Sequence, residues 1–256
     1  MDRRHPVEHQ LPWAESVLAV CAHPDDESFG LGAALSSFAG QGTTTSVLCL
    51  THGEASTLGP DAGDLHEIRE KELVLAAEEL GVGSVRLLEF ADGRLTGQSI
   101  GQLSSELRRA MDMVGPTLFL VFDEGGITGH PDHIRATGVA TIVAEEVGIP
   151  VLAWALPEAV TAQLNNEFGT TFVGRPPEEI DVIVEVDRSR QHRAIRCHAS
   201  QSSENPVLWR RLQLQEDREV FRWLDRGTAA QLVASPGPIG WGEKVGWAGI
   251  AELGNR

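Results

Sequence analysis

The sequence predicts an α/β fold: a Rossmann-like, doubly wound, mostly parallel sheet with helices on both faces and a C-terminal cap on the same core. Short apolar runs rich in β-branched residues recur along the first 157 residues, and segments with helical spacing of apolar residues separate them. Short connections between such segments are typical of parallel strands covered by crossover helices. A chain of 256 residues, 41% of them hydrophobic, is long enough to bury one core.

The alternation of strands and helices begins at residue 16. Residues 16–22 are a buried-type apolar run and predict the first strand. Residues 30–42 predict a helix that closes on Gly40 and Gly42, and residues 44–51 predict the second strand.

The clearest helix is expected at residues 64–81, where apolar residues recur at helical spacing and Gly81 stops the helix. The remaining elements of the alternation are a third strand, a helix, a fourth strand, a helix and a fifth strand, expected at 84–90, 99–115, 117–123, 131–148 and 151–157.

After residue 158 the pattern becomes less regular. One more strand is expected at 181–187, with helices at 189–200 and 207–226, and the Gly- and Pro-rich end is expected to form loops. We therefore expect a single domain over 1–256, with loose order in 1–15 and a cap and C-terminal extension in 158–256.

The charge balance limits the partners. The formal net charge is -16 and the sequence pI is about 4.9, which disfavours nucleic acid and anionic membrane surfaces. The most basic stretch is expected to be one solvated side of a helix and consists of Arg188, Arg190, Arg193 and Arg196. Whether the chain forms a homo-oligomer cannot be predicted from the sequence.

The location is predicted from three features. No apolar run of about 18 residues predicts a membrane span, and residues 1–12 lack the apolar stretch of a signal peptide. The three cysteines, Cys21, Cys49 and Cys197, form no CxxC pair, which is typical of a reduced protein, so we expect a cytoplasmic protein.

Two segments carry the same His-Pro-Asp tripeptide. Residues 22–27 read AHPDDE and residues 129–133 read GHPDH, and each follows a predicted strand and precedes a predicted helix. Helix capping explains the prolines and aspartates, because Pro is favoured at the first helical position and Asp in the first turn. Capping does not explain the three histidines, which point to chemistry.

In a doubly wound sheet, ligands bind where the strand order reverses, beside the first strand. The loops after the first and fourth strands flank that point, which places His23, Asp26, His130 and His133 around one crevice. Two imidazoles and one carboxylate around an open position are the ligand set of a catalytic zinc, although Fe, Co or Mn would also fit. Asp25, beside a ligand, is then the natural general base for a metal-activated water.

The two motifs together resemble those of the PIG-L/LmbE-like superfamily of zinc de-N-acetylases. Weaker similarities support this: residues 51–54 (THGE), the helix around Arg69, the Asp92-Gly93 turn, and residues 198–201 (HASQ). The resemblance covers roughly residues 16–205.

The resemblance implies a role for each matching residue. His23, Asp26 and His133 would hold the zinc, and Asp25 would be the general base. His130 would stabilise the oxyanion or assist proton transfer.

Three further positions would contact the substrate. Arg69 and Asp92 resemble positions that contact the sugar, although an ion pair on the helix surface is an alternative for Arg69. His198 would approach the site from its own or a neighbouring subunit.

The expected function is removal of an acetyl or other acyl group from the amide nitrogen of a small amino-sugar conjugate. An amidase that acts on a thiol S-conjugate is an alternative within the same family. A non-hydrolytic Rossmann-like module would need a glycine fingerprint after the first strand, where this chain has acids instead. A catalytically dead binding protein would lack a ligand or the base, whereas all of them are present here.

Overall fold

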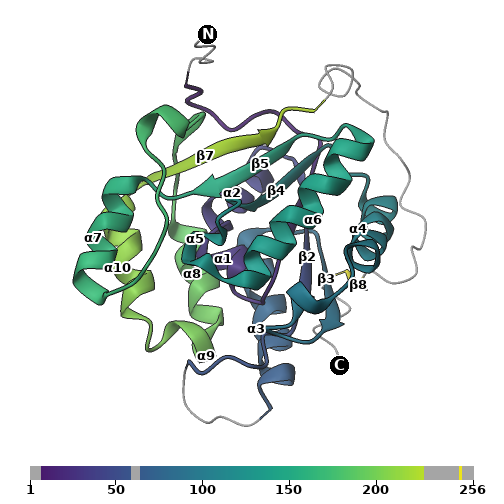
Figure 1. Ribbon diagram of the computed structural model, residues 1–256, viewed down its shortest axis with the longest axis horizontal. Coiled ribbons are helices and arrows are strands. Elements are labelled where there is room, and N and C mark those ends of the chain that lie inside the picture. The colour runs from purple at the N-terminus through teal and green to yellow at the C-terminus, as the bar shows by residue number, and fades with distance from the viewer. Residues whose placement is uncertain (1–6, 59–63, 228–247, 250–256) are drawn as a thin grey trace.

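The computed structural model describes residues 7–58, 64–227 and 248–249. Its centre is an eight-stranded sheet in the order β6-β7-β5-β4-β1-β2-β3-β8 (Figure 1). The strands are β1 (Ser16–Cys21), β2 (Thr44–Thr51), β3 (Ser84–Phe90), β4 (Leu118–Phe122), β5 (Val151–Ala155), β6 (Val182–Glu185), β7 (Arg218–Asp225) and β8 (Ala248–Gly249). Strands β1 to β5 pair in parallel, whereas β7 is antiparallel to both of its neighbours and β8 is antiparallel to β3. The predicted fold class is confirmed.

Helices cover both faces of this sheet. The longer ones are α2 (Gly32–Gly40), α3 (Leu65–Leu80), α4 (Ile100–Val114), α6 (Pro131–Val147), α7 (Glu158–Phe168), α8 (Ser189–Cys197) and α10 (Pro206–Gln215). Three single turns complete the helices: α1 (Asp26–Phe29), α5 (Gly126–Gly129) and α9 (Ala199–Ser202). Two short 3₁₀ turns lie at Leu95–Gly97 and Pro177–Glu179.

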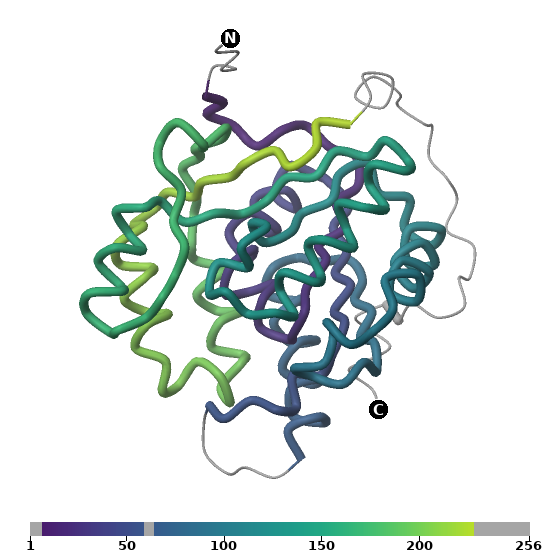
Figure 2. Tube along the Cα trace, viewed as in Figure 1, coloured from purple at the N-terminus to yellow at the C-terminus, as the bar shows by residue number. Residues whose placement is uncertain are grey.

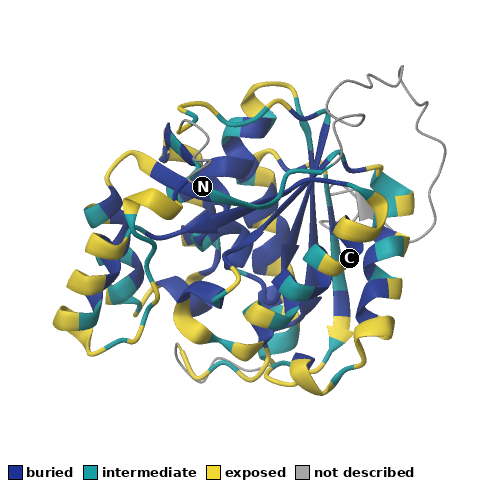
Figure 3. Cartoon of the chain, turned by 45° about the horizontal axis from the view of Figure 1, so that its top comes forward, coloured by how far each residue is buried: buried dark blue, intermediate teal, exposed yellow. Residues whose placement is uncertain are grey.

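The alternation of side chains along β1 divides the core into two layers. Val17, Ala19 and Cys21 pack with α2, α3 and α8 on one face. Leu18 and Val20 pack with α4 and α6 on the other face, which lies in front in Figure 1. Figure 3 shows the central strands buried, with most exposed residues on the outer sides of the helices, in the loops and at some strand ends. Burial on both faces explains why the strands are continuous apolar runs in the sequence.

The strand order reverses between β1 and β4, because β2 and β3 extend the sheet to one side and β5 extends it to the other. The loops after β1 and β4 therefore lie side by side at the carboxyl ends of the strands, as the sequence predicts. Among the described residues, no helix is long and apolar enough to cross a membrane.

The expectation of a helix over 207–226 is wrong in its second half. Helix α10 ends at Gln215, Glu216 takes φ 51°, and β7 follows and fills the sheet between β5 and β6. Neither glycine nor proline marks this break, and Val220 and Phe221 are buried because they pair with β5, a partner distant in sequence.

Two other segments differ from the expectations. Residues 158–168 form α7, although no helical spacing of apolar residues was recognised there. Arg188, expected on a solvated helix face, is buried and forms an ion pair with Glu219. Near the N-terminus, the backbone N–H of Glu8 donates to the carbonyl of Asp181 at 2.8 Å. Residues 1–6 and most of the Gly- and Pro-rich end lie outside the described residues.

Residues 158–227 gather on one flank and along one edge of the molecule, where Figure 2 draws them in green and yellow-green. They pack on the same core as the N-terminal half, because β6 and β7 extend the central sheet.

Candidate active site

The turn after β1 is closed by a buried carboxylate. Oδ2 of Asp26 accepts hydrogen bonds from the backbone N–H groups of Ala22 and His23 at 2.9 and 3.0 Å. Within this turn Asp25 has φ 122°, a conformation that non-glycine residues rarely adopt. Its N–H donates to Oε2 of Glu27 at 2.9 Å, which holds the strained backbone in place. Strain of this kind is concentrated at functional sites.

The turn after β4 is also strained. Gly126, Ile127 and Gly129 have φ of 66°, 60° and 74°. The chain then enters α6 through His130, the N-cap residue, whose Nδ1 accepts from the N–H of Asp132 at 3.2 Å. This turn places His133 in the first helical turn, facing β1.

Three side chains converge between the two turns. Nδ1 of His23 lies 3.1 Å from Nε2 of His133, and that Nε2 lies 3.1 Å from Oδ1 of Asp26. The second oxygen of Asp26 lies 3.9 Å from Nδ1 of His23. Such separations are compatible with three ligands at about 2.1 Å from one small cation.

The far nitrogens of the two imidazoles have partners that suit metal ligation. Nδ1 of His133 lies 3.2 Å from the carbonyl oxygen of Gly126, so it can donate to it and leave a lone pair on Nε2. Nε2 of His23 faces Oδ1 of Asp92 at 3.0 Å and Oδ2 of Asp132 at 3.6 Å, without a well-aligned hydrogen bond. These carboxylates favour a proton on Nε2 and so favour Nδ1 as the ligand atom. Ligating histidines commonly have such partners.

The charges of the cluster depend on one another. Burial alone would raise the pKa of Asp26, but the adjacent His133 and His23 bring that pKa well below its usual range. Burial alone would lower the pKa of His23, but Asp132 and Asp92 raise it to about 10. The cluster therefore combines an ionised carboxylate with two imidazoles whose near nitrogens face each other. A proton or a cation can occupy the space between these nitrogens and the carboxylate.

Asp25 lies beside this cluster. Its Oδ2 lies 2.8 Å from Nη2 of Arg69, which also donates to the carbonyl of Pro24, and Nη1 of Arg69 donates to the carbonyl of Gly53. Arg69 is buried, so it is not the surface ion pair considered as the alternative. Burial raises the pKa of the Asp25 carboxyl to about 6, although the Arg69 charge opposes the shift. A carboxylate with this pKa can accept a proton near neutral pH.

His130 presents its other nitrogen to the site. Its ring centroid lies 4.8 Å from that of His23 and 5.1 Å from that of His133. Burial lowers the pKa of His130, and the charges of His23 and His133 lower it further. Because Nδ1 accepts the helix-capping bond, the neutral ring carries its proton on Nε2 and can donate it. His130 also offers a nitrogen to a possible three-histidine cluster with His23 and His133, so it is an alternative third ligand.

The structure does not bring His198 to the cavity wall. His198 is fully buried, with its Nε2 2.6 Å from Oε1 of Glu27. The segment after it is bound in the same way: the N–H and Oγ of Ser200 donate to Glu72 at 2.8 and 2.6 Å, and Oε1 of Gln201 accepts from Ser56 at 2.6 Å. Residues 198–201 therefore fasten α9 beneath the first turn, and His198 supports Asp25 through Glu27.

The convergent groups form one end of a cavity of about 570 Å³. Arg69 and Asp92, for which the family resemblance implies contact with the substrate, both line it. Oδ2 of Asp92 also accepts from the N–H of Ala55 at 3.0 Å. The rest of the cavity is largely apolar and is lined by Phe29, Phe122, Trp154, Leu156, Phe172, Val207 and Leu208.

Several residues of the site were missed by the sequence analysis. Asp132 is fully buried and accepts from the N–H groups of Gly93 and Leu95 at 2.8 and 3.1 Å, so it holds the loop that carries Asp92. Its place in the second His-Pro-Asp tripeptide was a usable signal, but it was assigned to capping. Arg211, which also lines the cavity, carries no motif.

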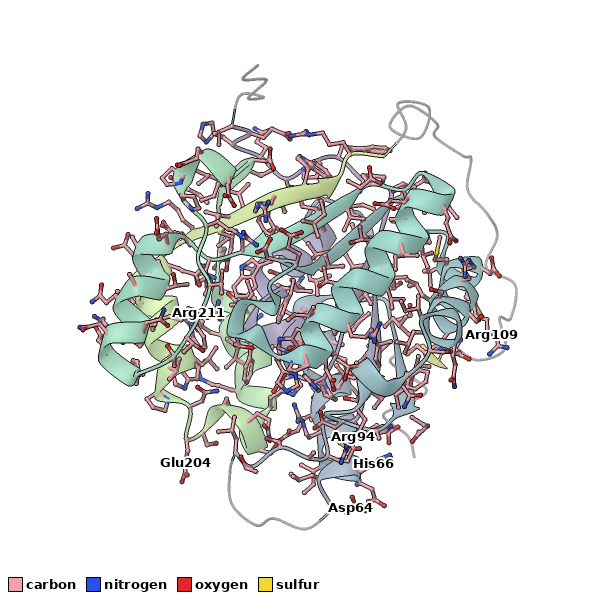
Figure 4. All side chains as sticks on the ribbon, viewed as in Figure 1. Asp64, His66, Arg94, Arg109, Glu204 and Arg211 are labelled. Atoms are coloured by element: carbon pink, nitrogen blue, oxygen red, sulfur yellow. The ribbon has the colours of Figure 1, made fainter. Side chains whose placement is uncertain are left out.

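A second group of possible ligands, His52, His66 and Glu70, lies around the start of α3, where Figure 4 labels His66. His52 and His66 stack with ring centroids 3.4 Å apart, and their Nε2 atoms lie 3.2 and 3.1 Å from the two oxygens of Glu89. Their ring planes are 9° apart, so their in-plane lone pairs run side by side and do not meet at one ion. The arrangement suits one carboxylate bridging two imidazoles.

Part of the chain matches the model of a known protein family. The model for PIG-L, GlcNAc-PI de-N-acetylase, matches residues 18–145, which include both turns. A probable N-acetyl-alpha-D-glucosaminyl L-malate deacetylase 2 of Bacillus anthracis is 30% identical over 219 residues, covering 82% of this chain and 92% of the relative. The chain belongs to the PIG-L family.

Other PIG-L relatives match over shorter lengths. A 1D-myo-inositol 2-acetamido-2-deoxy-alpha-D-glucopyranoside deacetylase of Catenulispora acidiphila is 31% identical over 59% of this chain and 58% of its own length. A probable N-acetylglucosaminyl-phosphatidylinositol de-N-acetylase of Schizosaccharomyces pombe is 32% identical over 47% of this chain and 48% of its own length. The chain thus spans nearly all of the first relative and about half of the other two.

Solved structures share the PIG-L fold. The N,N'-diacetylchitobiose deacetylase of Pyrococcus horikoshii aligns with TM-score 0.63 and 22% identity, covering 82% of this chain and 84% of that one. The zinc-inhibited form of a teicoplanin deacetylase aligns with TM-score 0.61 and 22% identity, covering 81% and 97%. A 4-carboxy-2-hydroxymuconate hydratase of Pseudomonas putida aligns with TM-score 0.61 and 19% identity, covering 84% and 98%. Since the fold also carries a hydratase, the fold alone does not decide the reaction.

Proposed function

We propose that this chain is a zinc-dependent deacetylase that hydrolyses the acetamide of a small amino-sugar conjugate. The observation that carries the proposal is the convergence of His23 Nδ1, His133 Nε2 and the Asp26 carboxylate beside Asp25, a carboxylate left over for proton transfer. Membership of the PIG-L family, whose model is that of a de-N-acetylase, supports the same reaction.

The residues present fit a metal ion. Two imidazoles with partners on their far nitrogens and one ionised carboxylate form a three-ligand set with room for further ligands on the cavity side. Nitrogen and oxygen donors suit zinc, and Fe, Co or Mn would also be accepted by this set. A divalent cation held there would supply Lewis acidity, which polarises a carbonyl and makes water more acidic.

The protein groups around this position divide the proton transfers. Asp25 accepts the proton of the attacking water, because burial brings its pKa to about 6, and afterwards returns a proton to the leaving nitrogen. Arg69 holds Asp25 Oδ2 in place from the side away from the ligands. His130, neutral with its proton on Nε2, donates to the oxyanion that develops on the acetamide oxygen. No tyrosine occurs in the chain, so none can act as the acid.

The substrate class is proposed from the relatives. The Bacillus anthracis and Catenulispora acidiphila proteins are named for acetylated glucosamine joined to malate and to inositol. Removal of a longer acyl group and cleavage of a thiol S-conjugate amide use the same groups and are alternatives.

Elemental analysis of the purified protein, run beside acetate release from a panel of N-acetylglucosamine conjugates, tests the proposal. We expect about one zinc per chain and acetate from at least one member. A longer-chain N-acyl glucosaminide and a thiol S-conjugate in the same panel separate the alternatives. A protein that takes up no metal and releases no acyl group after zinc is supplied would overturn the proposal.

Two substitutions give matched controls. His133→Ala removes a proposed ligand, so both metal and activity should be lost. His192→Ala changes a histidine of α8 that belongs to none of the convergent groups, so both should be retained. Equal loss in the two variants would contradict the ligand assignment.

A further inference from the structure

The cavity holds a cation that the hydrolytic chemistry does not use. Arg211 lies on α10, where Figure 4 labels it. It lines the cavity beside Trp154, and only 5% of it is exposed. The other charged groups that line the cavity lie at the end with the convergent histidines, namely His23, Asp25, Asp26, Arg69, Asp92, His130 and His133.

The positive charge of Arg211 is not balanced locally. The nearby buried carboxylate, Glu219, forms an ion pair with Arg188 at 2.5 Å and accepts from Trp154 and Gln215 at 2.6 and 3.0 Å. Arg211 forms no ion pair with any carboxylate of residues 7–58 and 64–227. Glu219 is thus the ion-pair partner of Arg188, and Arg211 has no carboxylate of its own among the described residues. Burial lowers the pKa of Arg211 to about 10, with Glu219 opposing the shift, which reflects the cost of this charge.

Arg211 is also held ready for a ligand. Its guanidinium lies 4.9 Å from the centroid of the Trp154 ring, and the indole is fixed by its bond to Glu219. Of its five N–H donors, Nη1 uses one on Oε1 of Gln215 at 2.8 Å and Nη2 uses one on the carbonyl of Phe29. The remaining donors have no acceptor among the described residues, and Arg211 is one of the residues that line the cavity.

The charges at the two ends of the cavity are complementary to one kind of molecule. At the histidine end, the carboxylates of Asp25, Asp26 and Asp92 are matched by Arg69 and by the cation proposed there, whereas Arg211 has no carboxylate partner among the described residues and would attract an anionic group. Between the two ends lie aromatic and aliphatic side chains, with Phe122 joining His133 on one side to Trp154 on the other at centroid distances of 5.0 and 5.2 Å. This wall fits an apolar stem.

We propose that Arg211 is a specificity-determining residue that binds the anionic end of the substrate, a carboxylate or phosphate carried on an apolar stem attached to the amino sugar. A planar guanidinium with free donors binds such oxyanions in bidentate fashion. The proposal rests on the proposed deacetylase function and specifies the part of the substrate beyond the sugar.

The test uses the zinc-loaded full chain and two substrates that differ in one charge. They are an aryl N-acetylglucosaminide with a carboxylate on the ring and its methyl ester. We expect the wild type to prefer the carboxylate, and Arg211→Gln to lower this preference in kcat/KM by roughly 10- to 100-fold, mainly through KM. Zinc content should stay close to wild type, which shows that the variant is folded, and hydrolysis of the methyl ester should fall far less than hydrolysis of the carboxylate. An aryl phosphate in place of the carboxylate tells which anion is bound better.

Arg211→Lys keeps the charge without the planar fork and should retain part of the preference. If Arg211→Gln leaves the preference unchanged, Arg211 is only a structural clamp on Trp154, and the proposal is overturned.

Failure of the deacetylase function can be told apart from failure of this proposal. The deacetylated aryl glucosaminide with a carboxylate should raise the melting temperature of the wild type more than that of Arg211→Gln, and its methyl ester should not discriminate between them. This binding measurement needs no turnover. Equal shifts for the two proteins contradict the role of Arg211, whether or not any substrate is hydrolysed.

Discussion

The two His-Pro-Asp turns have the same tripeptide, but the histidine and aspartate side chains have different roles in each turn. In the first turn the histidine and the carboxylate after the tripeptide face the proposed metal position, and the aspartate of the tripeptide, Asp25, points into the cavity. In the second turn the aspartate of the tripeptide, Asp132, is fully buried and braces a neighbouring loop, while His130 caps the helix.

Backbone conformation causes this difference. Asp25 lies before α1 with φ 122°, which rotates its side chain away from the helix, whereas Asp132 lies inside the first turn of α6. An identical tripeptide therefore gives a proton acceptor in one turn and a support in the other. Single substitutions can test these roles separately.

The largest effect is expected from Asp25→Asn. Asparagine tolerates positive φ and keeps the shape, but it cannot accept a proton as the carboxylate does. Turnover should fall by about 10²- to 10⁴-fold with zinc content unchanged. Steady-state kinetics and elemental analysis on one preparation check this, and near-normal turnover would show that another group is the base.

The next largest effect is expected from His130→Ala. Loss of one oxyanion donor should lower kcat by roughly 10²-fold. Zinc should remain, in contrast to His133→Ala, which should lose it. If His130→Ala also loses zinc, the ligand set is the three histidines and Asp26 has another role.

A smaller effect is expected from Asp132→Asn. The carboxamide removes one of the two carboxylates that face Nε2 of His23, so zinc affinity should fall by roughly 10- to 100-fold. Competition with a chromogenic chelator measures this. An unchanged affinity would mean that Asp92 alone orients His23.

The smallest effect on turnover is expected from His198→Gln, which keeps a hydrogen bond to Glu27 but removes the charge. Burial alone would lower the pKa of His198, yet Glu27 raises it overall above the ordinary 6.5. A raised pKa in the folded state stabilises the fold below pH 6.5, and this stabilisation is lost as the pH rises through the folded-state pKa. The variant should therefore lose about 1–3 kcal/mol in free energy of unfolding at acidic pH and less at alkaline pH. Urea unfolding at two pH values checks this, and a loss independent of pH would contradict a charged His198.

The central fold could be predicted from the sequence because the local patterns of apolar residues and glycines agree there with the pairing of strands that are distant in sequence. Strands β1 to β5 are buried on both faces and stand out as apolar runs, and glycines end the helices between them, as Gly81 does for α3. Strand β7 could not be predicted, because its register depends on β5 and β6 and neither glycine nor proline separates it from α10.

The candidate site could be predicted at the positions where helix capping does not explain a histidine. His23, His130 and His133 could be placed together from strand order alone. The positions of Glu27, His198 and Arg211 could not, because each depends on contacts between segments about 170 or more residues apart in sequence, such as Glu27 with His198 or Arg211 with Phe29. The interpretation of His198 as a substrate contact overlooked that its motif could serve to fasten α9.

The division of the cavity along the chain has a consequence for how such proteins can diversify. The family match ends at residue 145, and every group proposed for bond cleavage lies before that point. Most of the apolar wall, from Trp154 to Arg211, lies after it, on elements that rest on the same sheet. The groups proposed for bond cleavage thus lie in the earlier part of the chain, and most of the apolar wall lies in the later part. Exchange of the later stretch between relatives would change the apolar wall, and it would also have to keep His198, which supports Asp25 through Glu27.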